Sequence, residues 1–248
     1  MTGGSTTLTD SVIKANEVNS SGAAQGGGIY CAGSLLSLAD CKVNANQANG
    51  GVGTSDVAGS DATGGGLDIA LNSTATVSNT TFQNNIASGG VGGDGANGGN
   101  GYGGGIAVTD TSSLSLTGIT LLGNHALGGA GGSGADGGNG EGGGVYVGTE
   151  GTVTINQSHL GTNQALGGNG LEGGNGLGGG CYVANGASLA VTDCSIVLNS
   201  ALGGEEQQGG NNGEGIGGGV YTLGTFTYDT ATSIRLNHAS TSGDNIGP

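Results

Sequence analysis

Basic residues are almost missing from this sequence: three Lys and Arg stand against eighteen Asp and Glu, which gives a formal net charge of −15. Binding to nucleic acid or to anionic lipid needs clustered basic side chains, so we expect neither function. Tryptophan is absent and only two Phe occur. No apolar run approaches the roughly 18 residues that a membrane-spanning helix needs, so we expect no membrane insertion.

A recognisable secretory leader is also missing, because Met1 is followed directly by patterned sequence. An acidic surface with little lysine favours solubility outside the cell. We therefore expect an extracellular or bacterial cell-surface protein that forms a segment of a longer chain or a subunit of a fibre.

Glycine, by contrast, is abundant: it supplies 63 of the 248 residues, and glycine triplets return at steps of 38, 39, 39, 36 and 39 residues. A fixed period in this range indicates a solenoid, in which each repeat is one unit stacked on the last. The triplets begin at Gly26, Gly64, Gly103, Gly142, Gly178 and Gly217. We divide this single domain into units at about residues 1–25, 26–63, 64–102, 103–141, 142–177, 178–216 and 217–248.

The unit that follows Gly142 shows what each repeat contains. It has an alternating stretch at 145–147, a turn at 148–151, a second alternating stretch at 152–155 and a short third stretch that ends at Asn163. Apolar residues that alternate with period two indicate strands, and glycine at this density disfavours a helix by about 1 kcal/mol per residue. Three short strands with tight corners predict an all-β fold, a parallel β-helix of about seven coils.

Equivalent residues recur in columns along the predicted coils. The second strand carries an inward apolar pair in each unit, such as Leu114 with Leu116 and Val153 with Ile155. The third strand places an asparagine three residues after its apolar residue: Asn16, Asn46, Asn85, Asn124, Asn163, Asn199 and Asn237. Identical amides stacked about 4.8 Å apart can donate and accept along the axis. We interpret this column as a structural ladder.

The paired motifs Gly64-Gly65-Gly66-Leu67 and Phe82-Gln83-Asn84-Asn85 resemble the GGA-I and FxxN repeats of chlamydial polymorphic outer-membrane proteins. The sequence is also similar to right-handed parallel β-helix repeats of large bacterial surface proteins, within the pectin-lyase-like superfamily. This resemblance covers nearly the whole chain and implies a right-handed coil and an extracellular passenger, often adhesive. The triplet here is GGG rather than GGA, and no autotransporter barrel follows in this sequence.

Glycine tracts separate the asparagine column from the next triplet. They begin at Gly89, Gly128, Gly167 and Gly203, with a degenerate version at Gly50, and their phase is close to three residues. A threefold phase is typical of polyglycine II, the left-handed helix related to polyproline II, which needs neighbouring chains to satisfy its backbone. Two interpretations stay open: a flat glycine layer stacked along one edge of the β-helix, or a set of flexible loops.

No catalytic or cofactor-binding constellation is recognisable. Asp10 and Asp40 share a column in adjacent coils, and Asp136 lies in a half-match to a calcium-binding nonapeptide, so these three acids are the calcium candidates. Polysaccharide lyases of the β-helix type need clustered acids with a basic residue or calcium, whereas Lys14, Lys42 and Arg235 lie too far apart to cooperate. We expect no enzyme and no resident metal.

Two further patterns give candidate sites. Cys31 with Cys41, and Cys181 with Cys194, share single coils, so each pair is either a disulfide or two buried free thiols. Outward positions of the second strand form a Thr-x-Thr array that resembles the ice-binding face of antifreeze β-solenoids, although threonine is also a common strand residue. The candidate ice face contains Thr74, Thr76, Thr152, Thr154, Thr225 and Thr227.

Three hypotheses about function follow. The first is a non-enzymatic extracellular structural or adhesin-like solenoid that forms fibres, with a surface glycan or host receptor as partner. The second is an ice-binding protein, through the threonine face or the glycine layer. The third is a polysaccharide-binding or lyase-type β-helix. Neither end shows a capping helix or polar lid, so we expect self-association end to end or neighbouring domains of a longer chain.

Overall fold

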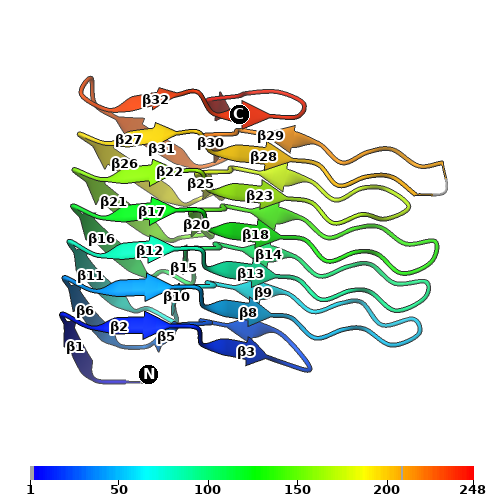
Figure 1. Ribbon diagram of the computed structural model, residues 1–248, viewed down its shortest axis with the longest axis horizontal. Coiled ribbons are helices and arrows are strands. Elements are labelled where there is room, and N and C mark those ends of the chain that lie inside the picture. Colours follow the sequence, from blue (N-terminus) through cyan, green and yellow to red (C-terminus); the bar gives the residue numbers. More distant parts are fainter. Residues whose placement is uncertain (1–2, 208) are drawn as a thin grey trace.

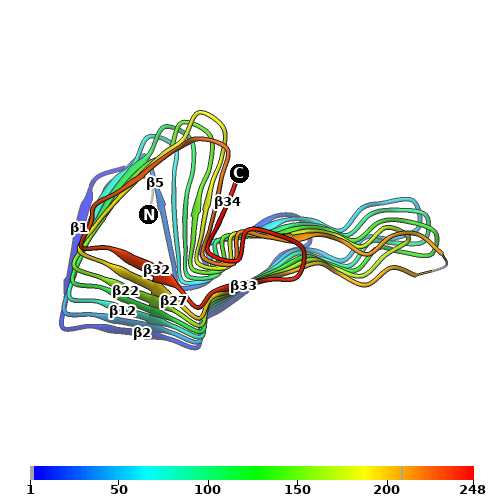
Figure 2. The same cartoon turned by 90° about the horizontal axis from the view of Figure 1, so that it is seen from above.

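The computed structural model describes residues 3–207 and 209–248, which form a parallel β-solenoid with a lateral extension (Figures 1 and 2). Seen from above in Figure 2, the chain runs anticlockwise as it rises towards its C-terminus, so the coil is right-handed. Within these ranges there is no helix that could cross a membrane.

Three sheets, which we name A, B and C, enclose the body of the solenoid. Sheet A contains β5 (Ile29–Ala32), β10 (Leu67–Ala70), β15 (Ile106–Val108), β20 (Val145–Val147), β25 (Cys181–Val183), β30 (Val220–Thr222) and β34 (Ile246–Gly247). Sheet B contains β1 (Ser5–Thr9), β6 (Leu35–Ala39), β11 (Thr74–Ser78), β16 (Ser113–Thr117), β21 (Thr152–Asn156), β26 (Ser188–Thr192) and β31 (Thr225–Tyr228). Sheet C contains β2 (Val12–Lys14), β7 (Lys42–Asn44), β12 (Thr81–Gln83), β17 (Thr120–Leu122), β22 (His159–Gly161), β27 (Ser195–Val197) and β32 (Ser233–Arg235).

Two further sheets, D and E, lie where the lateral extension leaves the body. Sheet D contains β3 (Glu17–Asn19), β8 (Gln47–Asn49), β13 (Ile86–Ser88), β18 (His125–Leu127), β23 (Gln164–Leu166), β28 (Ser200–Leu202) and β33 (His238–Ala239). Sheet E contains β4 (Ala24–Gln25), β9 (Ala62–Thr63), β14 (Gly101–Tyr102), β19 (Gly140–Glu141), β24 (Gly176–Leu177) and β29 (Gly215–Ile216). Each described coil therefore has up to five short strands rather than the three that the sequence predicts.

Four sheets have seven strands and sheet E has six, so the solenoid makes about six full turns, slightly fewer than the seven coils expected. All strand pairs are parallel and in register, with Thr152 opposite Ser113 and Ser188, for example. The expected inward pairs of the inner coils are buried, including Leu114, Leu116, Val153 and Ile155. They join one apolar core that runs the length of the axis.

The glycine triplets are explained by close approach of the next coil. The first glycine of each triplet has a left-handed backbone, with φ of 67° at Gly142. A Cβ on the third glycine, Gly144, would lie 2.6 Å from the carbonyl oxygen of Gly180 one coil above. Real Cβ atoms do not approach so closely, so these positions exclude side chains wherever another coil follows.

The seven asparagines occupy one column, and the inner ones use their amides in the same way. Asn124 donates from Nδ2 to Asn163 Oδ1 at 2.9 Å and to the carbonyl of Phe82 at 3.1 Å. Its Oδ1 accepts the backbone N–H and the Nδ2 group of Asn85 at 3.1 and 2.9 Å. The ladder thus satisfies buried backbone groups at the corner between sheets C and D.

The glycine tracts form an ordered extension, which we call the wing. It comprises the segments between sheets D and E: 50–61, 89–100, 128–139, 167–175 and the described part of 203–214. Each segment has an outgoing and a return run, and Figure 2 shows these runs as two layers to one side of the body. The expectation that glycine loops stack along one edge is therefore confirmed.

Hydrogen bonds join the two layers of the wing in a climbing pattern. Gly138 donates to Gly129 within its coil, at 2.9 Å, and Gly129 donates to Gly99 of the coil below, at 2.8 Å. A Cβ on Gly129 or on Gly138 would lie 2.0 Å from a carbonyl oxygen of the coil below. The space between the layers therefore admits only backbone, which explains the glycine content.

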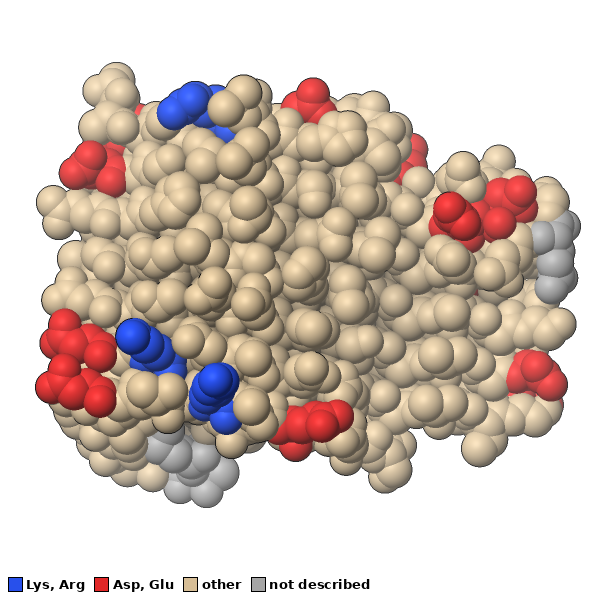
Figure 3. Space-filling model, viewed as in Figure 1, with Lys and Arg blue, Asp and Glu red and all other residues tan. Residues whose placement is uncertain are grey.

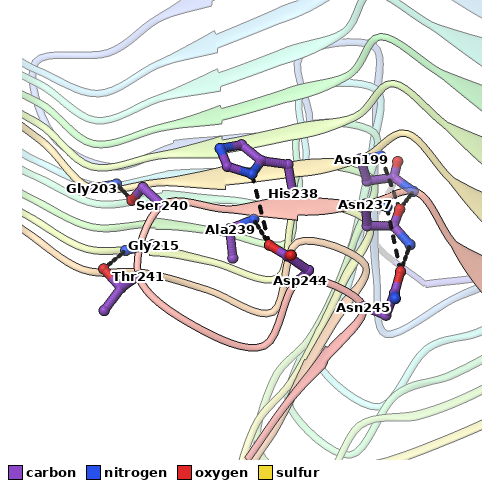
Figure 4. Close-up of polar contacts among 10 residues, drawn as sticks. All are labelled: Asn199, Gly203, Gly215, Asn237, His238, Ala239, Ser240, Thr241, Asp244 and Asn245. Atoms are coloured by element: carbon purple, nitrogen blue, oxygen red, sulfur yellow. Dashed lines mark hydrogen bonds and ion pairs between the residues drawn. The ribbon is translucent and has the colours of Figure 1, made fainter.

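The edge of the solenoid at β33 and β34 differs from the sequence-based expectation, because a polar lid is present there. Asp244 and Asn245 fold over the last turn and accept hydrogen bonds from Ala239 and Asn237 (Figure 4). The expectation was wrong at this edge because it searched for a separate capping element, whereas these two residues are part of the last turn.

We predict that Asn124→Ala lowers the free energy of unfolding by about 3 kcal/mol, because the buried backbone N–H of Asn85 loses its acceptor and the side-chain bonds to Phe82 and Asn163 are lost. The matched control is Asn16→Ala at the exposed end of the column. Only the bond from Asn16 Nδ2 to Asn46 Oδ1 is lost there, because the backbone N–H bond remains, and a loss of about 1 kcal/mol is expected. Urea unfolding followed by circular dichroism measures both. Equal losses in the two variants would show that the ladder bonds do not carry the stability.

Candidate functional site

The candidate ice face lies on the outer side of sheet B, where its residues form two straight columns. One contains Thr74, Ser113, Thr152, Ser188 and Thr225, and the other contains Thr76, Ser115, Thr154, Ala190 and Thr227. Ser113 Oγ donates to Thr74 Oγ1 at 3.2 Å, so neighbouring hydroxyls in one column are within hydrogen-bond reach. Leu35 interrupts the first column and is 56% exposed.

The three calcium candidates do not come together. Asp10 and Asp40 lie at the corner between sheets B and C, with left-handed φ of 50° and 55°, and that column continues through other left-handed residues. Asp136 lies in the wing, where its Oδ1 accepts the backbone N–H of Glu172 at 3.1 Å. Among residues 3–207 and 209–248, no group of three or more His, Cys, Asp or Glu has metal-binding geometry.

The four cysteines are buried and free. Cys41 and Cys194 stand in a corner column with hydroxyl residues, and Cys194 Sγ accepts the backbone N–H of Ser158 at 3.4 Å. Cys31 and Cys181 face the core from different positions of sheet A, opposite Ile69 and Val145. Of the two alternatives for each pair, the structure has the free thiols.

Polar side chains on the return layer of the wing form two rows that sequence reasoning missed. We call them the wing rows: Asp61, Asn100, Asn139, Asn175 and Glu214 in the first, and Asn97, Asp136, Glu172 and Asn211 in the second. Within each row, a side-chain oxygen accepts the backbone N–H of the next member, as Asn139 Oδ1 does from Asn175 at 2.8 Å. These oxygens satisfy N–H groups that face away from the other layer.

The wing rows also present donors to solvent. Asn97 and Asn175 use their oxygens for the coil above and make no other side-chain hydrogen bond to the described chain, so their NH₂ groups stay available. Asn100, Asn139 and Asn211 also donate within the protein, to Tyr102, Glu141 and Glu172 respectively. Asn97, Glu172 and Asn211 are exposed, while Asn100 and Asn175 are half-buried. The result is a series of amide and carboxylate groups that repeats at one-coil spacing, about 4.8 Å.

A second missed feature is a tyrosine stack in the inner corner between sheet A and the wing. Tyr146, Tyr182 and Tyr221 are successive outward residues of sheet A, and their ring centroids lie 5.2 and 5.3 Å apart. Ala107 leaves a gap one coil below, and Tyr102 from sheet E takes that place with its ring 4.9 Å from Tyr146. The rings of sheet A stack on one another, and the tilted contact of Tyr102 with Tyr146 braces the base of the wing against the body.

A buried carboxyl group lies in this stack. Glu141 of sheet E is 8% exposed, and Asn139 Nδ2 donates to its Oε1 at 3.4 Å. Burial raises the pKa of Glu141 to about 7; a hydrogen bond from Asn139 opposes this shift and the charge of Asp61 adds to it. Glu141 can therefore exchange a proton near neutral pH, but its enclosure suits a buried polar contact better than proton transfer to a polymer.

Asp68 is a second buried acid on sheet A, between Tyr30 and Ala107 in register. Neither of its carboxyl oxygens has a hydrogen-bond partner among the described residues, and burial, with the charge of Asp110, raises its pKa to about 7. A buried acid without partners is favoured in its neutral form. The sequence signal for Asp68 was the outward column of sheet A, which reads Tyr, Asp, Ala, Tyr, Tyr, Tyr.

No family model matches this sequence, and no curated protein matches it. Among solved structures, a match is a double mutant of the periplasmic alginate epimerase AlgG, with 12% identity and a TM-score of 0.25. The alignment covers 90% of this chain and 57% of that chain, so this chain spans a little more than half of the epimerase structure. At this distance the likeness carries no inference about activity.

We predict that Glu141→Gln stabilises the protein at pH 8 but not at pH 4. In the unfolded chain the carboxyl loses its proton near 4.5, whereas in the folded chain it keeps the proton up to about 7. The free energy of unfolding of the wild type therefore falls as pH rises between these values, by up to about 3 kcal/mol, and Gln removes that loss.

Thermal melts between pH 4 and pH 8 measure this difference, with Glu205→Gln as the matched control because Glu205 is exposed on the wing. The control is expected to follow the wild type at each pH. A constant difference between Glu141→Gln and the wild type across the range would contradict the buried-acid explanation.

Proposed function

We propose that this protein is a non-enzymatic, extracellular, adhesin-like β-solenoid that binds a polysaccharide along the wing rows. The observation that carries this proposal is a layer on which amide and carboxylate side chains repeat at one-coil spacing, with the NH₂ groups of Asn97 and Asn175 available to a ligand. A polymer with a short repeat can use several such groups at once, and linked weak contacts give avidity without a deep pocket. The resemblance to outer-membrane passenger repeats favours the same location and role.

Charge narrows the class of polysaccharide. The wing rows include Asp61, Asp136, Glu172 and Glu214, while Figure 3 shows basic residues at only a few places on the view that it gives of the molecule. With a formal net charge of −15, the protein repels anionic polymers such as uronates. The proposal is therefore a neutral or amino-sugar polysaccharide, whose hydroxyl oxygens accept from the amides and whose ammonium groups approach the carboxylates.

We predict that Asn175→Asp weakens polysaccharide binding about tenfold while the melting temperature stays nearly unchanged. Aspartate keeps an oxygen that accepts the backbone N–H of Glu214, but it loses the NH₂ donor that faces solvent. The matched control is Asn169→Asp in an outgoing run, where Oδ1 similarly accepts the N–H of Glu205. Biolayer interferometry on immobilised dextran, mannan, chitosan and alginate measures binding.

Equal weakening by the two substitutions would place binding outside the wing rows. No binding of the wild type to any neutral or amino-sugar polymer, or preferential binding to alginate, would contradict the proposed ligand class.

Ice binding is the second candidate function, and the straight columns of sheet B favour it. Hydroxyls of Thr74, Thr152 and Thr225 share one column, and those of Thr76, Thr154 and Thr227 share the other. Such a flat, regularly spaced array is what binding to an ice lattice requires.

If this function is correct, Thr154→Tyr abolishes thermal hysteresis because the ring interrupts the array. Gln83→Tyr on the exposed side of sheet C is the matched control and is expected to keep full activity. A nanolitre osmometer measures both variants. Absence of hysteresis in the wild type would remove the candidate.

A further inference from the structure

The last turn of the solenoid breaks the glycine-triplet pattern. β34 pairs with β30 so that Ile246 lies opposite Val220. The residues that precede Ile246 are Gly243, Asp244 and Asn245, so an Asp and an Asn stand where each earlier coil has its second and third glycines. Gly243 keeps the left-handed backbone of the first position, with φ of 67°.

Side chains at these two positions are compatible only with an edge that no coil in register covers. In every earlier triplet, a Cβ on the third glycine would collide with the coil above: for Gly180 it would lie 2.5 Å from the carbonyl oxygen of Gly219. For Gly219 itself the distance to the carbonyl oxygen of Asn245 is 2.4 Å. Asp244 and Asn245 therefore occupy space that a following coil would need.

These side chains also replace the contacts of a following coil (Figure 4). Asn245 Oδ1 accepts from the backbone N–H and Nδ2 of Asn237, at 3.4 and 3.1 Å, as the next ladder asparagine would. Asp244 Oδ1 accepts the N–H of Ala239 at 2.8 Å and lies 3.7 Å from His238 Nδ1. The ladder is thus closed at its upper end by a residue of the same chemistry.

Two hydroxyls complete this lid at the base of the wing. Ser240 Oγ accepts the N–H of Gly203 at 3.2 Å, and Thr241 Oγ1 accepts the N–H of Gly215 at 3.1 Å. Figure 4 shows both on the short connection that replaces a glycine tract in the last turn. We call the segment from Ser240 to Asn245 the lid.

The opposite edge, at β1 to β3, has no such lid in the described residues, and its acceptors and apolar side chains are left open. Asn16 donates from its backbone N–H and Nδ2 to Asn46, but no donor in the described ranges reaches its own Oδ1. Leu8, Ile13 and Val18 face the interior there and are only half-buried, whereas the inward residues one coil above, such as Val43, are fully buried. This edge offers acceptors and apolar side chains in the register of a coil.

We infer that the solenoid assembles with one polarity: the edge at β1 to β3 docks a further β-solenoid coil whose last ladder asparagine is uncapped, and the lid closes the other edge. The occupant is a coil of this chemistry because the ladder runs in one direction, with N–H and NH₂ donors pointing up and Oδ1 atoms accepting from below. A coil docked at this edge would make the same contacts that successive coils make throughout the molecule. A second copy with its lid in place does not fit.

Removal of the lid side chains tests this inference, because Asp244→Gly with Asn245→Gly restores the triplet and provides an uncapped probe. The wild type alone is expected to sediment as a monomer at all concentrations. The double variant alone is expected to form head-to-tail oligomers that lengthen with concentration. Added wild type is expected to shorten them, because it can occupy only one end of a growing row.

A third variant separates specific docking from aggregation. Adding Ile13→Glu to the double variant places a charge on the edge at β1 to β3, and it is expected to return the protein to a monomer. Sedimentation velocity measures the sizes, and circular dichroism with thermal melts selects folded proteins. Assembly of the wild type, a folded double variant that stays monomeric, or assembly that Ile13→Glu does not reduce would each overturn the inference.

Discussion

The register between successive coils is the constraint on which the rest of the structure depends. Strands about 4.8 Å apart bring each residue against its equivalent in the next coil, so every column must satisfy the same steric and hydrogen-bonding demands from one end to the other. The glycine triplets, the asparagine ladder and the wing rows each satisfy this requirement in a different column. Glycine occupies the positions where a side chain would collide with the next coil. An Asn, Asp or Glu side-chain oxygen accepts the backbone N–H groups that have no carbonyl opposite them.

The body of the fold could be predicted from sequence because the residues of its columns differ in polarity from their neighbours in the chain. Apolar pairs such as Val153 and Ile155 alternate with polar residues, and Asn163 recurs at a fixed distance from them. Sheets D and E were missed as strands because they are two or three residues long and Gly- or Ala-rich, so no alternation marks them. The lid was missed because only the register of β34 with β30 shows that Asp244 and Asn245 stand at the second and third positions of a glycine triplet.

The wing shows why surface chemistry was harder to predict than the core. The three-residue repeat of the wing was visible in the sequence. Which of its three positions faces solvent depends on how the two layers pair, and a glycine-rich sequence has no apolar residues that would mark the buried position. Asp136 was therefore interpreted as a calcium candidate, whereas its oxygen accepts the backbone N–H of Glu172. The tyrosines of the stack could be recognised in the outward column of sheet A. The contact of Tyr102 with Tyr146 could not be predicted without knowing where the wing lies.

A wing of this kind gives a solenoid something that the body alone cannot supply. The outer sides of sheets B and C are limited to a few residues per coil, whereas the return layer of the wing extends each coil sideways without adding an apolar core. Its cost is conformational entropy of glycine, which the layer offsets because backbone hydrogen bonds run to neighbours in the same coil and in adjacent coils. Such a layer is stable only while several coils are stacked, so the wing and the long solenoid depend on each other.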